Sequence, residues 1–213
     1  MSMTIKDIHT HLPDAPRDAL ADIRVTGTVP GPARLSSAGL HPWDVTPDCR
    51  EALDEVARLA RHPLVAAIGE CGIDRLAPVP LTLQTEAFVR QAEIADRCGK
   101  PLIIHAVRAT ADILALHRAL RPATVWIIHG FRGKPEAAAQ LTRRGIRLSL
   151  GARFNPATAR SIDPAMLLTE TDESPIGIDA VRDAIAAARG ITRAALDSIV
   201  DANAADIFGT PAP

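Results

Sequence analysis

The chain has 213 residues, which is enough for one domain with a full hydrophobic core. Its formal net charge is −1, from 24 Lys and Arg against 25 Asp and Glu, and this balance excludes a protein that binds nucleic acid through a broad basic surface. Aromatic residues make up 3% of the chain and Tyr is absent, which argues against a long platform of stacked bases. We therefore expect any contact with phosphate groups to be local.

The three cysteines, Cys49, Cys71 and Cys98, are odd in number and widely spaced, which favours free thiols in a reducing compartment over disulfides. The N-terminal residues reach Asp7 and His9 without the apolar core of a signal peptide. No apolar run is long enough to span a membrane. We therefore predict a cytoplasmic protein with no membrane partner.

The predicted elements alternate between strands and helices along the chain. A short apolar run that ends in His9 and His11 predicts the first strand, and a β-branched run predicts a second over 23–29. The other expected strands lie at 37–41, 64–70, 101–105, 123–128, 146–150 and 166–172. The expected helices lie at 46–61, 82–98, 109–120, 135–144, 179–189 and 192–207, with a helical turn at 155–160. Thr46 and Pro47 are the expected N-cap and first residue of the first helix.

Eight candidate strands that mostly alternate with helices favour parallel βα units of the α/β class. In so short a chain they predict a compact, distorted (β/α)8 TIM barrel that has lost some outer helices, as a single domain over residues 1–213. An open, doubly wound sheet is the alternative. It is disfavoured because no glycine-rich phosphate turn follows a strand, and Gly27 and Gly31 do not form GxGxxG.

Ionisable side chains lie at most of the predicted strand ends. They are His9 with His11, His41, Glu70, His105, His129 and Asp172. A single His-x-His pair or one histidine at a strand end is usually structural. Parallel barrel strands end on one face, however, and so many separately buried polar groups would each need a partner. A shared cation supplies one partner for all of them.

Four imidazoles and two carboxylates suit two divalent ions, Mg, Mn or Zn. The first ion is assigned to His9, His11, Glu70 and Asp172, and the second to His105 and His129. Glu70 can bridge the two ions through its two oxygens. Bound cations bring the pKa of water toward neutrality, so a water or hydroxide is the expected nucleophile, and Asp172 can also accept its proton. We therefore predict Glu70 and Asp172 as the catalytic residues.

Six stretches together resemble the TatD family of metal-dependent deoxyribonucleases, and they appear in the family's order. They are Asp7-Ile8-His9-Thr10-His11, Gly39-Leu40-His41-Pro42-Trp43, Gly69-Glu70-Cys71-Gly72-Ile73-Asp74, Pro101-Leu102-Ile103-Ile104-His105, Ile128-His129-Gly130-Phe131-Arg132-Gly133 and Glu170-Thr171-Asp172. The resemblance implies a distorted TIM barrel of the amidohydrolase superfamily, a divalent-metal site and magnesium-dependent exonuclease activity on DNA. It implies the same six metal ligands as the strand ends do.

The chain departs from the family pattern around the expected site. The region between His11 and Gly39 is shortened, as in a short-chain branch of the family. Val107 stands where the family usually has Arg, with Arg108 one place later, and Glu173 adds an acidic residue beside Asp172. The metal ligands are complete, whereas the walls that would contact the substrate are altered.

Five further residues are candidate substrate contacts, and each has a plainer interpretation. His41 could contact substrate or support a ligand, or it could serve the turn before Pro42. Trp43 could stack on a base or sugar, or pack over the barrel mouth. Arg108, Arg132 and Lys134 follow ligand-bearing strands and could hold a phosphate, or be solvated loop charges.

The favoured function is a metal-dependent hydrolase that cleaves phosphodiester bonds at nucleic-acid ends. One alternative is a small-molecule phosphoesterase or amidohydrolase of the same superfamily. Another is a metal-binding scaffold without catalysis, against which the retained Asp172 argues. The partner is thus a nucleic-acid end or a small phosphoester, and the sequence makes no prediction of the oligomeric state.

Overall fold

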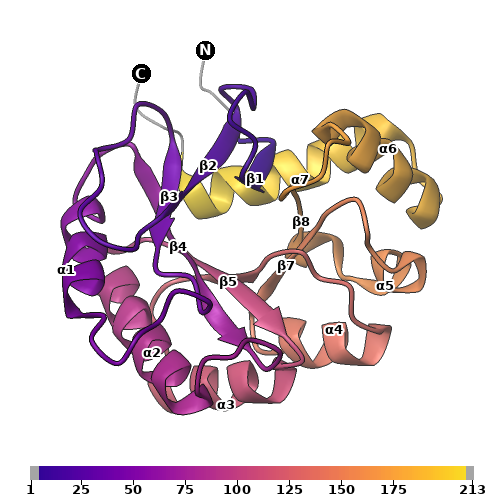
Figure 1. Cartoon of the computed structure of the whole chain (residues 1–213). Helices are drawn as coiled ribbons and strands as arrows, with labels where there is room; N and C mark the ends of the chain where they lie inside the picture. Colours follow the sequence, from indigo (N-terminus) through magenta and orange to yellow (C-terminus); the bar gives the residue numbers. More distant parts are fainter. Residues whose placement is uncertain (1–4, 210–213) are drawn as a thin grey trace. The chain divides into compact units, whose positions relative to one another are not determined.

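A computed structural model describes residues 5–209, and this part of the chain contains eight β-strands and seven α-helices. The strands are parallel, and their order in the sheet is their order in the chain, β1 to β8 (Figure 1). This is the strand order of a (β/α)8 barrel. By internal contacts the chain divides into a central unit, Ala21–Trp126, and a terminal unit made of Met1–Leu20 and Ile127–Pro213.

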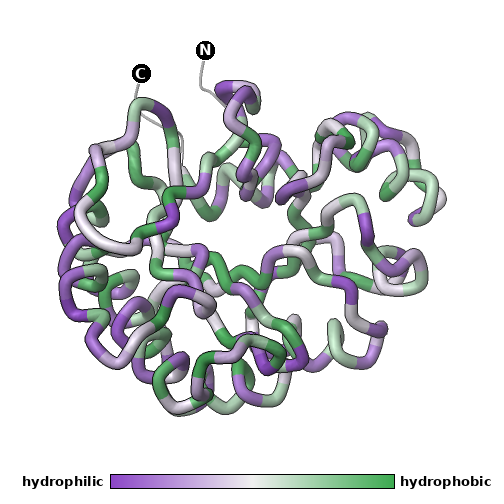
Figure 2. The backbone as a smooth tube through the Cα atoms, viewed as in Figure 1, coloured by the Kyte–Doolittle hydropathy of each residue, from purple (hydrophilic) through white to green (hydrophobic). Residues whose placement is uncertain are grey.

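The central unit contains four parallel strands and the helices that follow them. The strands are β2 (Ala19–Arg24), β3 (Ser36–Gly39), β4 (Val65–Asp74) and β5 (Leu102–Val107). The helices are α1 (Arg50–Leu59), α2 (Leu81–Cys98) and α3 (Thr110–Leu120). β4 and β5 are apolar and buried because helices cover parallel sheets. Along α1 and α2 hydrophobic and hydrophilic residues alternate, as expected of helices that pack one face on a sheet (Figure 2).

The terminal unit joins the first strand of the chain to the last three. Its strands are β1 (Asp7–Thr10), β6 (Trp126–Ile128), β7 (Arg147–Leu150) and β8 (Leu167–Thr169). Its helices are α4 (Pro135–Thr142), α5 (Pro156–Ser161), α6 (Ile178–Arg189) and α7 (Arg193–Phe208), with a 3₁₀ turn at Pro164–Met166. The buried guanidinium of Arg182 on α6 donates to Thr169 Oγ1 at 3.1 Å and to the Lys6 carbonyl at 2.8 Å. It therefore ties α6 to β8 and to the start of β1.

The predicted fold class is confirmed, including the loss of outer helices. In the described residues no helix lies between β1 and β2 or between β2 and β3, whereas each later strand is followed by one. No helix in residues 5–209 is long and apolar enough to cross a membrane.

Two local predictions are wrong. The second strand is β2 at Ala19–Arg24 rather than 23–29. The β-branched residues after Arg24 lie in a loop instead, because this loop is hydrogen-bonded to α1: the Val29 amide donates to Glu55 Oε1 at 3.0 Å. The first helix begins at Arg50 rather than after Thr46. The Thr46 hydroxyl donates to the Asp48 carbonyl at 3.0 Å and so belongs to the preceding turn.

Candidate metal centre

The end of β1 is held against the segment that follows β8. The His11 amide donates to the Asp172 carbonyl at 3.1 Å, and the Asp172 amide donates to the His9 carbonyl at 3.0 Å. Asp172 Oδ1 lies 3.7 Å from His11 Nε2 and 4.0 Å from His9 Nε2. Asp172 has a φ of 56°, in the left-handed region that Asp tolerates better than most residues. Backbone pairing thus brings two imidazoles and one carboxylate together.

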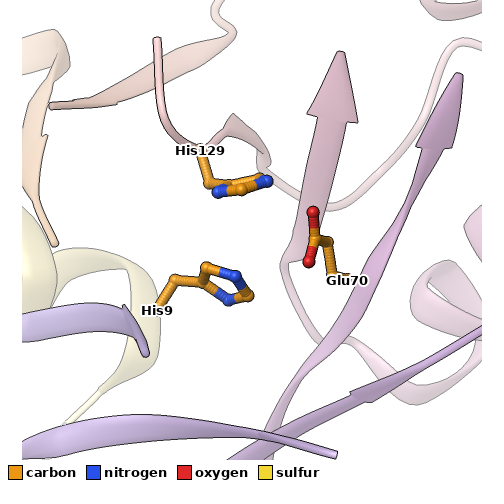
Figure 3. Close-up of side chains that lie close together, drawn as sticks. All are labelled: His9, Glu70 and His129. Carbon is orange, nitrogen blue, oxygen red and sulfur yellow. The ribbon is translucent and has the colours of Figure 1, made fainter. Parts of the chain in front are cut away.

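His129, directly after β6, lies beside this cluster. Its ring centroid is 4.4 Å from that of His9 (Figure 3). His129 Nδ1 lies 3.4 Å from Oε1 of Glu170, a fully buried carboxylate that also accepts a hydrogen bond from the Gly130 amide at 2.5 Å. Burial alone would raise the pKa of Glu170, but His129, His9 and Ser149 together outweigh it and lower that pKa below its usual value. One ligand atom each from His129, Glu170 and Asp172 lies within 4.8 Å of the others.

Asp7 connects β1 to the segment that follows β8 through hydrogen bonds. Its Oδ2 accepts a hydrogen bond from the Thr171 hydroxyl at 2.6 Å, and its Oδ1 accepts from the amides of Thr171 at 3.0 Å and His9 at 3.3 Å. Burial is the main cause that raises the pKa of Asp7, to about 6. The buried Asp7 side chain therefore joins β1 to the segment that carries Asp172.

Glu70 lies in a β-bulge of the central unit. Ile68 pairs with Leu102 and Cys71 with Ile104, so that β4 has one more residue than β5 between these two pairs. A Cβ atom on Gly69 would overlap the Ile103 carbonyl oxygen, which is why the bulge requires glycine there. Bulges turn a side chain away from the regular strand direction, and they are common beside active sites.

The Glu70 carboxylate lies among two imidazoles of the same unit. Glu70 Oε1 is 2.5 Å from His105 Nδ1 and 3.4 Å from His41 Nε2. One ligand atom from each of the three residues lies within 4.8 Å of the others. The Trp43 amide donates to His41 Nδ1 at 3.1 Å, which requires that His41 nitrogen to be unprotonated. His41 is therefore oriented by the backbone of its own turn.

Asp74, at the end of β4, supports the other side of His105. Its Oδ2 lies 3.3 Å from His105 Nε2 and accepts a hydrogen bond from Trp43 Nε1 at 2.7 Å. Burial would raise the pKa of Asp74, but the hydrogen bonds, first that from Trp43, lower it below its usual value. A carboxylate in contact with a histidine fixes the orientation of the ring.

A cavity of about 170 Å³ opens beside Asp172 in the terminal unit. It is lined by Gly130, Arg132, Gly151, Ala152, Arg153, Glu170, Thr171, Asp172, Glu173, Ser174 and Pro175. Two arginines thus share one cavity with a predicted metal ligand, as required of a site that binds a phosphate next to a metal.

The predicted ligands fall into two sets, one in each unit. The terminal unit brings together His9, His11, His129 and Asp172, and the central unit brings Glu70 to His105. Of the predicted substrate contacts, His41 and Trp43 lie beside His105, and Arg132 lines the cavity. Arg108 and Lys134 are exposed and are not among the residues that line it.

Four polar residues of these clusters were missed as site residues: Asp7, Asp74, Glu170 and Arg153. Asp74 and Glu170 had a recognisable signal, because residues i and i+2 share a face of an extended strand. Glu170 precedes Asp172 by two positions, and Asp74 follows Glu70 by four. The predicted strand over 64–70 ended too early to include Asp74, whereas β4 continues to it.

The donor sets fit a divalent metal ion. Imidazole nitrogens and carboxylate oxygens are the ligands of zinc and related cations in hydrolases, and each unit gathers both kinds at close range.

Comparison with known proteins decides the family. The sequence model of the family described as "TatD related DNase" matches residues 31–209. The chain belongs to this family. A Mycobacterium tuberculosis relative named "Uncharacterized metal-dependent hydrolase TatD" is 33% identical over 151 residues, which cover 68% of this chain and 57% of that protein. A Citrobacter koseri relative named "3'-5' ssDNA/RNA exonuclease TatD" is 36% identical over 124 residues, which cover 54% of this chain and 45% of that protein. The chain thus spans about half the length of these TatD relatives.

Solved TatD structures share the fold. The Escherichia coli TatD homologue YjjV superposes with a TM-score of 0.72 at 20% identity, covering 83% of this chain and 77% of that one. A TatD family hydrolase from Entamoeba histolytica gives 0.73 at 17% identity, covering 83% and 75%. The predicted TIM barrel and the predicted TatD family are confirmed, and the family together with the donor sets supports divalent metal binding.

Proposed function

We propose that this TatD protein is a metal-dependent phosphodiesterase that releases nucleotides from the end of a single nucleic-acid strand. The observation that carries the proposal is Asp172, which contacts two histidines and also lines a cavity with two arginines. Relatives named 3'-5' ssDNA/RNA exonuclease support a nucleic-acid substrate and attack at the 3′ end.

Two divalent ions would be held by the predicted ligands. His9, His11, Glu70 and Asp172 would bind one ion, and His105 and His129 would bind the other. We take residues 1–213 to form a single domain. The imidazole ligands favour Zn²⁺ over Mg²⁺, and the carboxylate ligands also suit Mn²⁺.

The bound metal would lower the pKa of a water molecule. At neutral pH this water would attack the phosphorus as the bond from phosphorus to the 3′ oxygen of the preceding nucleotide breaks, which releases the terminal nucleotide. Asp172 would accept the proton of this water, because it lines the cavity. Arg132 and Arg153 would hold the phosphate through charge-assisted hydrogen bonds. His41 would orient the Glu70 carboxylate through the contact of its Nε2 with Glu70 Oε1.

The proposal is tested with metal-loaded protein on 3′- and 5′-labelled single strands of DNA and RNA, and on a panel of small phosphoesters. We expect stepwise release of nucleotides from the 3′ end, abolished in Asp172→Asn. Asp206→Asn is the matched control, since the Asp206 side chain is 70% exposed and pairs with Arg147 at 3.2 Å. Turnover of small esters alone would favour the small-molecule hydrolase, and tight metal binding without turnover would favour the scaffold.

A further inference from the structure

We propose that Trp43 and Leu76 form a platform that binds the nucleobase of the terminal nucleotide. The inference rests on the proposed function and deepens it, because it assigns the part of the substrate that binds beside the metal ligands of the central unit. The expected ligand is a single planar base rather than several consecutive nucleotides.

Both residues are exposed although they are large and apolar. In the described residues Trp43 is 55% exposed and Leu76 is 62% exposed, and Ile176 is the remaining large hydrophobic residue of this kind. Exposed apolar side chains scattered singly need no explanation, but two residues that hydrogen-bond to the same buried carboxylate beside a polar site do.

One buried carboxylate holds the two residues. Asp74 is 3% exposed; its Oδ2 accepts a hydrogen bond from Trp43 Nε1 at 2.7 Å, and its Oδ1 accepts one from the Leu76 amide at 2.8 Å. The two oxygens of one side chain therefore set the position of the indole and of the Leu76 backbone. An aromatic side chain whose orientation is fixed before binding loses less entropy when a ligand stacks on it.

Asp74 is itself fixed by α2. Gln84, which is 1% exposed, accepts a hydrogen bond from the Asp74 amide at 2.8 Å and donates to the Asp74 carbonyl at 3.0 Å. The adjoining loop is held by Arg75, whose guanidinium pairs with Asp112 on α3 at 2.7 Å. The segment that carries Asp74 and Leu76 is thus held by hydrogen bonds to α2 and by an ion pair to α3.

The platform lies next to predicted metal ligands. Asp74 Oδ2 also contacts His105 Nε2 at 3.3 Å, and the ring centroids of Trp43 and His105 are 6.1 Å apart. A base that stacks on Trp43 would therefore place its own sugar and phosphate beside His105. The Arg24 guanidinium, which is paired with Asp44, lies over the Trp43 ring with its central carbon 5.8 Å from the ring centroid. The base would therefore stack on the opposite face of the indole.

The size of the platform selects the ligand. One indole with one leucine is far smaller than the apolar patches that bind proteins or membranes. A planar base has a π-face that fits a single indole, and such stacking tolerates any base. The low aromatic content of the chain agrees with one stacked base rather than many.

The platform is tested first by fluorescence, which needs no turnover. The chain has two tryptophans, and Trp126 is buried against Phe88 in the core, so Trp126→Phe leaves Trp43 as the only emitter. Titration with deoxyadenosine 5′-monophosphate should quench this emission, whereas deoxyribose 5-phosphate should not. Equal quenching by both probes, or by neither, would overturn the proposal.

A second measurement separates this inference from the proposed function. Single strands with a normal or an abasic 3′-terminal nucleotide are hydrolysed by wild type and by Trp43→Ala. We expect KM to be roughly tenfold higher for the abasic strand in wild type, and the difference to disappear in Trp43→Ala. Trp43→Phe, which keeps an aromatic ring, should retain part of this difference in KM. Ile176→Ala is the control for loss of an exposed apolar side chain. Equal KM values for both strands would overturn the platform alone, while hydrolysis of neither strand would overturn the proposed function.

Discussion

Asp172 Oδ1 and His11 Nε2 lie 3.7 Å apart in the terminal unit, at the ends of the last and first strands of the chain. This contact depends on two backbone hydrogen bonds between β1 and the segment after β8. A cation bound there would link the two ends of the fold in addition to serving chemistry.

We therefore expect Mn²⁺ or Zn²⁺ to raise the melting temperature. A ligand that binds only the folded state at a hundred times its dissociation constant stabilises by about 2.7 kcal/mol. In Asp172→Ala the shift should shrink to a small fraction of the wild-type value, while Asp206→Asn should keep it. A melting temperature that does not respond to either metal in wild type would contradict the ligand assignment.

The cavity arginines should control substrate affinity. Arg132→Ala or Arg153→Ala is expected to raise KM for a nucleic-acid strand roughly tenfold with a smaller effect on kcat, because a charged hydrogen bond to the phosphate is lost. Lys134→Ala is the matched control, since this exposed cation lies close in sequence but does not line the cavity. If Lys134→Ala raised KM as much as the arginine variants, general charge rather than the cavity would bind the substrate.

The strand ends were predictable from the sequence because buried parallel strands are apolar, so that a terminal His or Glu stands out. His9, Glu70 and His129 are residues of this type. Glycine at 69 had no such signal, since the bulge it permits is seen only when β4 is paired with β5.

The spacing from Glu70 marks Asp74 in the sequence, but the tertiary contacts of Asp74 were not predictable. Asp74 gains its importance from Gln84 and Trp43, which contact it from other elements. The position of β2 was also missed, because the β-branched run at Val25–Val29 has strand propensity that the loop contact to Glu55 overrides. Arg153 stands after β7, where no predicted metal ligand drew attention to it.

Arg182 should be essential for the stability of the terminal unit. Its guanidinium is 1% exposed and pairs with Asp197 at 2.9 Å and Asp201 at 2.8 Å. Arg182→Met should lower the free energy of unfolding by about 3 kcal/mol, because it leaves two carboxylates without their buried partner. Urea titration followed by circular dichroism measures this. Arg90→Ala, which removes an exposed ion pair on α2, should cost no more than about 0.5 kcal/mol, and an equal loss in both variants would contradict this role of Arg182.

Glu55 should make stability depend on pH in the acid range. Hydrogen bonds from Arg58, and then from the Val29 amide, lower the pKa of Glu55 from its ordinary 4.5 to about 2. The ionised form therefore stabilises the folded state fully above pH 4.5, and this contribution is lost as the pH falls through 2. Glu55→Gln should thus be less stable than wild type at neutral pH, and the difference in urea midpoint should vanish toward pH 2. Glu51→Gln, at an exposed position one turn earlier, is the control; a wild-type advantage over Glu55→Gln that is the same at both ends of this range would contradict the prediction.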